Sequence, residues 1–192
     1  MIFVTVGAQM HFDRLVKCVD EWSALRDLHD IFAQIGPSQY VPRFIKYTKF
    51  ITPLEFKQTV IRADLIVAHA GMGSIISAFE ASKPILIMPR RGNFGETRND
   101  HQVATAKRFE AISSVQVAMN EMELVEKLNH LNRPQIQGNE ASQSINRQWA
   151  VCPYSHESDS ERSVTAAKAA CPHLLKALEA FIEGRLRSGA LY

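Results

Sequence analysis

Short apolar runs of strand length alternate along this chain with longer stretches in which apolar residues recur at helical spacing. Parallel strands need a crossover connection, usually a helix, so this alternation is typical of an α/β domain. The predicted strands are residues 2–6, 31–35, 64–69, 85–88 and 115–118, with a more polar strand near 44–50. The sequence therefore predicts one Rossmann-like, doubly wound parallel sheet over residues 1–131.

Helix starts are marked by capping residues between these runs. Thr52 and Glu55 have the spacing of a capping box, with a proline at the first helical position between them. Asn120 and Glu123 repeat this spacing before the last apolar-periodic stretch of the domain. We expect Asn99 to cap a further helix, which would begin just after it.

The composition changes after residue 131. Residues 132–161 are rich in Gln, Asn and Ser, which predicts a polar linker, and residues 162–192 are predicted to form a helical tail. The helix expected over 172–187 has one apolar face, formed by Leu174, Leu175, Leu178, Phe181 and Ile182. Packing of this face on a partner and packing back on the domain are both open.

Charge and cysteine content exclude several classes of function. The net charge is +2, from 22 basic and 20 acidic residues, which gives no electrostatic case for nucleic acid as a partner. Cys18, Cys152 and Cys171 form no metal-binding pattern, so we expect reduced thiols, no metal site and a cytoplasmic protein. The start of the chain does not resemble a signal peptide, and no apolar run approaches the ~18 residues of a membrane span.

Two turns that follow predicted strands carry the residues of chemical interest. One holds Gly7 and Gln9, and the other is the segment HAGMGS, residues 69–74. Glycines let a ligand approach the backbone, and the N-terminus of the following helix favours anions such as phosphate. The pattern lacks the lysine of a P-loop and the third glycine of a dinucleotide-binding fingerprint. Turn geometry alone explains such a glycine pair equally well, and a histidine at a strand end is often structural.

These residues also carry a resemblance to a known family. The stretch DLIVAHAGMGSIISAFEASKPILIMPRRGNFGETRNDHQVATAKRF resembles the donor-binding region of GT-B glycosyltransferases, in the group with the family 28 C-terminal domain. The opening, MIFVTVGAQMHFDRLVKCVDEW, is similar to the start of that domain where it stands alone as a separate protein. The resemblance covers residues 1–131, and HAGMGS and NDHQ are its most specific parts. It implies the C-terminal half of a GT-B fold and a donor-binding subunit of a split glycosyltransferase of polysaccharide or lipid-linked oligosaccharide synthesis.

The resemblance also implies roles for individual residues. The diphosphate of a UDP-sugar would be held by His69, Gly71, Gly73 and Ser74, with Gly7 and Gln9 on the opposite wall. The donor sugar would be held by Asn99, Asp100, His101 and Gln102. Many relatives have a ribose-binding Glu three residues after the serine, but this chain has Ser77 there and Glu80 one turn later. A hydroxyl is a weaker ribose ligand than a carboxylate, and Glu80 is as well explained as a solvated residue.

Three arginines follow the fifth strand and form a predicted basic loop. Arg90, Arg91 and Arg98 are close enough in sequence to approach a diphosphate, an anionic acceptor or lipid headgroups. A solvated surface loop is the alternative interpretation.

A complete GT-B enzyme has two domains, and this chain resembles only the donor-binding one. No residue pattern marks a catalytic base, so we expect the base and the acceptor site on a membrane-anchored partner subunit, with a lipid-linked saccharide as acceptor. This hypothesis describes a hexosyltransferase subunit of a heterodimer, inactive alone, needing no cofactor besides its UDP-sugar substrate. It would act in exopolysaccharide biosynthesis at the cytoplasmic membrane face. The alternatives are a stand-alone nucleotide-sugar epimerase or hydrolase, and a non-catalytic nucleotide-binding module.

Overall fold

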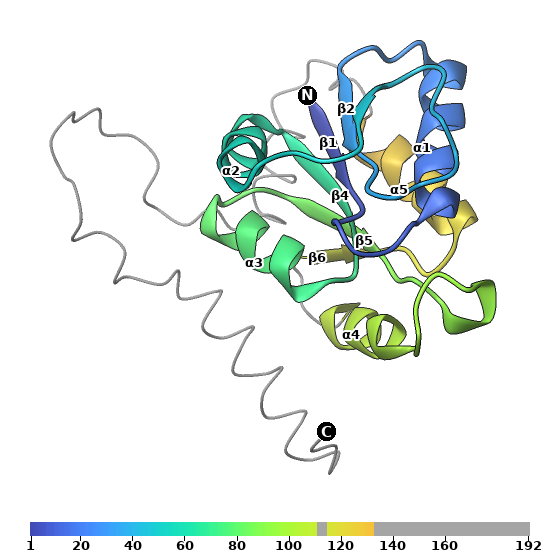
Figure 1. The fold of residues 1–192 in the computed structure, drawn as a ribbon. Coiled ribbons are helices and arrows are strands. Elements are labelled where there is room, and N and C mark those ends of the chain that lie inside the picture. The colour runs from blue at the N-terminus through green and yellow to red at the C-terminus, as the bar shows by residue number, and fades with distance from the viewer. Residues whose placement is uncertain (111–114, 133–192) are drawn as a thin grey trace, which may run out of the picture.

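The sheet has six parallel strands in the order β3-β2-β1-β4-β5-β6 in the part of the chain that the structure describes, residues 1–110 and 115–132. Its geometry comes from a computed structural model (Figure 1). The strands are β1 (Ile2–Thr5), β2 (Ile31–Gln34), β3 (Lys46–Thr48), β4 (Leu65–His69), β5 (Ile85–Met88) and β6 (Val115–Val117). Each neighbouring pair is parallel. The predicted doubly wound sheet is confirmed.

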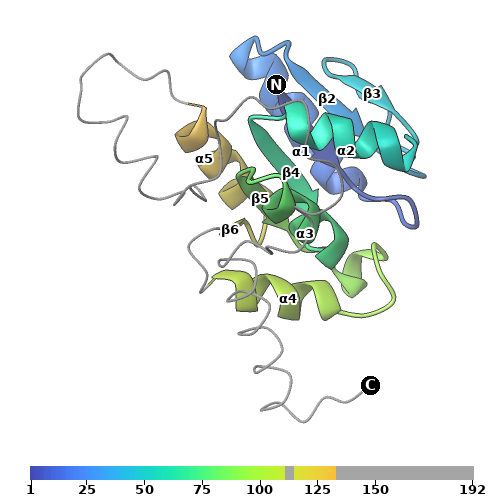
Figure 2. The same ribbon diagram turned by 90° about the vertical axis from the view of Figure 1, so that its left-hand side faces the viewer.

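Helices cover both faces of this sheet, as Figure 2 shows. They are α1 (Asp13–Arg26), α2 (Pro53–Arg62), α3 (Met72–Glu80), α4 (His101–Glu110) and α5 (Glu121–Leu131), with a short 3-10 turn, η1, at Gly92–Phe94. α1 and α5 pack on one face, against side chains such as Val4 and Val67, and α2, α3 and α4 pack on the other, against Phe3 and Ile66. Because both faces are buried, the central strands are apolar throughout, which is why their sequence does not alternate.

The two predicted capping arrangements are present, with one difference in detail. Thr52 accepts a hydrogen bond from the backbone N–H of Glu55, and the Glu55 carboxylate accepts one from the backbone N–H of Thr52, at 3.2 and 2.7 Å. At α5, Asn120 accepts from the backbone N–H of Glu123 at 2.9 Å. The Glu123 carboxylate, however, accepts from the backbone N–H of Met119, one residue earlier than a standard capping box requires.

Several predictions concern residues outside the described ranges. The predicted linker from residue 133 onward, the helical tail of residues 162–192, Cys152 and Cys171 all lie there. Cys18 is described: it is half-buried, and burial raises the pKa of its thiol to about 11, so it is a poor nucleophile. No helix in the described part of the chain is long and apolar enough to span a membrane.

Candidate functional site

The strand order reverses between β1 and β4, which is where open parallel sheets bind ligands. β1 leads into α1 on one face of the sheet, while β4 leads into α3 on the other (Figure 1). The loops after these two strands therefore diverge from neighbouring points at the carboxyl edge. Both turns identified in the sequence lie at this one place.

The ring of His69 lies between the two turns. A Cβ atom added to Gly71 would be 2.2 Å from Nε2 of His69, and one added to Gly7 would be 3.1 Å from its Cε1. Gly7 also has a φ of 75°, a conformation that side chains other than glycine rarely adopt. Glycine is thus required at positions 7 and 71 because the imidazole fills the space between them.

The environment of His69 keeps its imidazole neutral. Burial, assisted by the nearby positive charge of Arg90, lowers the pKa of His69 to about 4. Its Nδ1 is buried and forms no hydrogen bond of standard geometry with the described residues, and an interaction with the backbone of Thr5 opposes the fall in pKa. A neutral imidazole has one N–H to donate and one nitrogen to accept, and a buried nitrogen without a partner is unfavourable. Because Nδ1 is enclosed, Nε2 is the ring nitrogen through which a ligand would bind, and the predicted contact with a diphosphate stays a prediction.

The N-terminus of α3 is uncapped and faces the same edge. Gly71 precedes the helix, in extended conformation, and provides no side chain to cap it. The first turns of α3 and α4 contain no acidic residue, whereas those of α1, α2 and α5 each contain at least one. The positive end of the α3 dipole and its first N–H groups therefore have no carboxylate from the helix itself. The helix begins at Met72, so Gly73 and the largely buried Ser74 lie in its first turn rather than in the preceding loop.

A buried polar cluster fixes the backbone at Gly7. The Thr5 hydroxyl donates to Oε1 of Gln34 at 2.6 Å, and Nε2 of Gln34 donates to the Gly7 carbonyl at 3.0 Å. The Gly7 N–H donates in turn to the Thr5 hydroxyl at 3.3 Å. Sequence reasoning missed Gln34, which is buried at the end of β2. The only signal was a polar residue at the end of an otherwise apolar strand.

Arg90 is buried beneath the β1–α1 loop and holds its backbone. This corrects the prediction that Arg90 belongs to a basic loop with Arg91 and Arg98. Its side chain is 4% exposed, and its guanidinium donates to the backbone carbonyls of Val6, Met10 and His11. Burial lowers the pKa of Arg90 to about 10, so the group is charged at neutral pH. Three carbonyl oxygens offset that charge, and the ring of Phe12 lies 5.4 Å from it. Arg90 therefore has a structural role in holding this loop and is not solvated.

The other two predicted arginines differ from Arg90 and from each other. Arg91 is half-buried and donates to the carbonyl of Met119 at 2.7 Å. Only Arg98 is an exposed side chain. The three arginines therefore do not form one exposed basic loop, because the guanidinium of Arg90 donates to the backbone carbonyl of Val6, 84 residues away in sequence.

A bidentate ion pair that sequence reasoning missed fixes the loop after β5. Arg14 of α1 donates from Nε and Nη2 to the two carboxylate oxygens of Glu96, at 2.8 and 2.9 Å. Glu96 is buried and also accepts from the backbone N–H of Arg91 at 2.9 Å. A third contact joins Arg14 to Glu121 of α5 at 3.2 Å. The pair ties the loop that carries Arg98 to α1.

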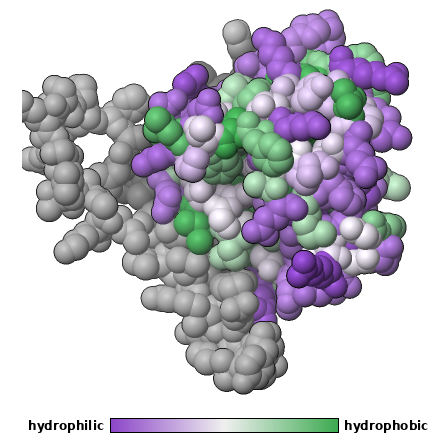
Figure 3. Space-filling model, in the orientation of Figure 1, coloured by the Kyte–Doolittle hydropathy of each residue, from purple (hydrophilic) through white to green (hydrophobic). Residues whose placement is uncertain are grey.

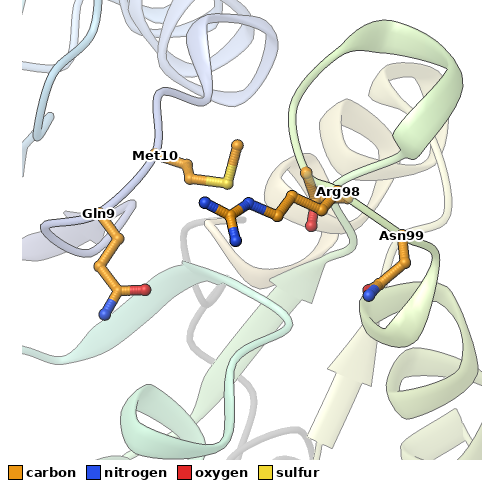
Figure 4. A pocket seen from close by; sticks show the side chains of 5 residues that line it. Gln9, Met10, Arg98 and Asn99 are labelled. Atoms are coloured by element: carbon orange, nitrogen blue, oxygen red, sulfur yellow. The ribbon is translucent and has the colours of Figure 1, made fainter.

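An open cleft of about 460 Å³ lies between the β1–α1 loop and the loop before α4. It is lined by Gln9, Met10, Thr97, Arg98 and Asn99 (Figure 4). The Arg98 side chain extends toward Met10, with Gln9 and Asn99 on either side. The volume is within the range of small-molecule sites, roughly 300–1,000 Å³. The fold thus brings together three predicted residues, Gln9, Arg98 and Asn99, although the HAGMGS residues do not line this cleft.

Comparison with known proteins identifies the family of this chain. The model of the glycosyltransferase family 28 C-terminal domain matches residues 1–151. The chain belongs to this family. It is 29% identical over 118 residues to the human UDP-N-acetylglucosamine transferase subunit ALG13 and 30% identical over 118 residues to the mouse protein of that name. Each match covers 56% of this chain and 10% of the relative, so the chain spans about a tenth of their length.

Among solved structures, an NMR solution structure of ALG13 is 20% identical to this chain. The match covers 76% of this chain and 92% of that one, with a TM-score of 0.49.

The four residues that the resemblance assigned to the donor sugar have different environments in this family 28 domain. Asp100 accepts from the backbone N–H of Gly92 at 2.8 Å, and Oε1 of Gln102 accepts from that of Arg90 at 3.1 Å. Asn99 and His101 are both exposed. The role of all four in sugar binding stays a prediction. Asp100 and Gln102 also stabilise the loop between β5 and α4 through these hydrogen bonds. Asn99 accepts through Oδ1 from the backbone N–H of His101, the first residue of α4, at 3.4 Å, which supports its predicted capping role, although Asp100 stands between Asn99 and the helix.

The candidate ribose ligands lie further along α3. Ser77 is half-buried in the middle of the helix, and Glu80 is its last residue and is exposed. Glu80 is about 9 Å further along the helix axis than Ser74, at 1.5 Å per residue. That distance favours its interpretation as a solvated residue over a role beside the N-terminus. Within residues 1–110 and 115–132, no group of three or more His, Cys, Asp or Glu side chains could hold a metal ion.

Proposed function

We propose that this domain binds the UDP-sugar donor of a heteromeric glycosyltransferase, with the diphosphate at the N-terminus of α3. The observation that carries the proposal is the arrangement around His69. An uncapped helix N-terminus without an acidic residue, a neutral histidine and the glycine at position 7 meet where the strand order reverses. Membership of the family 28 C-terminal domain supports the choice of a nucleotide sugar as ligand. The names of the human and mouse relatives support UDP as its nucleotide.

Under this proposal the domain stabilises the leaving group of the reaction. An acceptor hydroxyl attacks the anomeric carbon, the bond from that carbon to the diphosphate oxygen breaks, and UDP leaves with the electron pair. Negative charge then grows on the diphosphate. N–H groups of the first turn of α3, the Ser74 hydroxyl and the neutral His69 are preorganised donors for that charge. Their contribution needs no movement at the moment of bond cleavage.

A partner subunit supplies what the described residues do not offer. The acceptor hydroxyl must lose a proton. His69, whose pKa is lowered to about 4 at the carboxyl edge of the sheet, is assigned to the diphosphate and not to this role. We therefore assign the base and the acceptor site to a membrane-anchored second subunit, with a polyprenyl diphosphate-linked saccharide as acceptor. The word "subunit" in the names of the two relatives supports a heteromeric enzyme. We further propose that the enzyme acts in exopolysaccharide biosynthesis at the cytoplasmic membrane face.

The test is sugar transfer from a labelled UDP-sugar to a polyprenyl diphosphate-linked saccharide. We expect activity from the chain co-expressed with its membrane-anchored partner and none from the chain alone. His69→Ala in the complex is expected to lower kcat. The matched control, His29→Ala, changes an exposed histidine before β2, at the opposite edge of the sheet, and is expected to have no effect. Transfer by the purified chain alone, at the rate of the complex, would overturn the assignment of the base to a partner.

A further inference from the structure

An exposed edge of the sheet carries alternating aromatic and basic side chains. Within residues 43–50, RFIKYTKF, the exposed fractions are 55% for Phe44, 41% for Tyr47 and 55% for Phe50. Three basic residues in the same segment are also exposed. These six residues, here called the β3 edge patch, are Arg43, Phe44, Lys46, Tyr47, Lys49 and Phe50. They lie in β3 and immediately before and after it, and β3 is the outermost strand of the sheet on this side (Figure 2).

Further apolar side chains border the β3 edge patch. Val41, Leu54 and Ile61 are 58%, 66% and 53% exposed. Figure 3 shows hydrophobic side chains gathered near the connection from β3 to α2, with hydrophilic ones around them. Residues 31–54 contain no Asp or Glu, so the segment has no acidic side chain of its own to balance its cations. The next carboxylate, Glu55, is held by Thr52 in the cap of α2.

The exposure of these aromatic side chains is built into the fold by a buried carboxylate. Asp20 of α1 is fully buried and accepts hydrogen bonds from three successive backbone N–H groups, those of residues 43–45, at 2.9, 2.9 and 3.1 Å. The Tyr40 hydroxyl donates to the same carboxylate at 2.7 Å. Asp20 thus fixes the backbone at Phe44, so that the Phe44 ring faces outward while the Ile45 side chain enters the core.

Lysines on an outer strand are often explained as protection against pairing with another sheet. That explanation does not cover three exposed aromatic rings among them, since large exposed apolar groups at one place mark an interaction surface. Aromatic rings favour the headgroup level of a membrane, and clustered basic residues are attracted to anionic lipids. We propose that the β3 edge patch docks this domain directly on an anionic lipid surface.

The geometry gives this docking a consequence for the site. The strands are parallel, so the carboxyl end of β3, next to Lys49 and Phe50, and the carboxyl end of β4, at His69, lie on the same side of the sheet, with β2 and β1 between them. Docking through the β3 edge patch would therefore place one end of the patch on the side of the sheet that carries the proposed site. The inference does not depend on donor binding, because it concerns side chains outside the proposed site.

The test is sedimentation of the full chain with phospholipid vesicles. We expect binding to vesicles containing phosphatidylglycerol, weak binding to pure phosphatidylcholine, and a loss of affinity as salt rises. Each basic residue near an anionic surface contributes about fivefold in affinity, so the triple change of Arg43, Lys46 and Lys49 to Gln should weaken binding about 100-fold. Replacing Phe44, Tyr47 and Phe50 by Ser should remove the binding that remains at high salt.

The matched control changes Lys17, Arg26 and Lys107 to Gln, which removes the same charge from exposed positions on α1 and α4. We expect this control to bind nearly as well as the unaltered chain. Circular dichroism and urea midpoints establish that every variant is folded. If a triple variant does not fold, single changes at Lys46 or Lys49 are tested in its place. The proposal is overturned if the unaltered chain does not sediment with anionic vesicles or binds both vesicle types equally. It is also overturned if the patch and control variants lose affinity equally, or if the patch variants bind unchanged.

Discussion

Replacing Gly71 by alanine tests the packing of His69 between the two glycines. The new Cβ would lie 2.2 Å from Nε2 of His69, while ordinary contacts of a Cβ begin near 3.4 Å. The ring is largely buried, so it has little room to move away from the new methyl group. Either the ring or the turn must therefore move by about an ångström, and the change acts on the proposed site without removing any polar group.

The expected cost follows from overpacking. Forcing extra atoms into a packed site costs about 1–3 kcal/mol. Gly71 has a φ of −100° and a ψ of 136°, which alanine adopts without strain. Alanine also reduces the conformational freedom of the unfolded chain, which offsets about 0.4–1 kcal/mol of this cost. We expect Gly71→Ala to lower the free energy of unfolding by about 1–2 kcal/mol.

Gly73→Ala is the matched control, two residues away in the same segment. A Cβ there meets nothing within 4 Å, and the residue is helical, so alanine should raise the free energy of unfolding by about 0.5–1 kcal/mol. Urea unfolding followed by circular dichroism should move the two midpoints in opposite directions. If Gly71→Ala is as stable as Gly73→Ala, the ring is not confined as described and the explanation of both glycines is refuted.

Three further predictions concern the groups that hold the site. The pKa of His69 is about 4 in the folded state and near 6.5 in the unfolded state, so stability present above pH 6.5 should fall by up to about 3 kcal/mol on acidification to pH 4. Urea titrations at several pH values should show that slope reduced in His69→Gln. Arg90→Met should lower the free energy of unfolding by at least about 2 kcal/mol, because it leaves buried loop carbonyls without a hydrogen-bond donor. In the Arg98→Met control the free energy of unfolding, measured by thermal unfolding, should change by less than about 0.5 kcal/mol. Arg14→Met should cost about 3 kcal/mol by leaving Glu96 buried and unpaired, and a double-mutant cycle with Glu96→Gln should recover part of it.

The sequence predicted those features that depend on neighbours along the chain. The capping box of Thr52 and Glu55 spans four residues, and the strand before His69 is recognisable from its apolar run alone. The meeting of Gly7 with the HAGMGS turn was also predictable, because adjacent parallel strands end at one edge of the sheet. These are local signals or direct consequences of the fold class.

What the sequence did not predict depends on partners far apart in the chain. Arg90, Arg91 and Arg98 look alike in sequence, and only the position of the β1–α1 loop distinguishes the buried one from the exposed one. Gln34 and Glu96 are polar residues whose burial is explained by groups 27 and 82 residues away. No periodicity or spacing encodes such pairs.

Calorimetric titration with UDP measures whether the α3 N-terminus and His69 bind the diphosphate of the donor. We expect UDP to bind to the unaltered chain, either alone or in complex with the partner subunit. Losing one hydrogen bond should weaken binding about tenfold in His69→Ala and again in Ser74→Ala, while the control His29→Ala should bind like the unaltered chain. UDP affinity that is the same in all three variants would contradict the account.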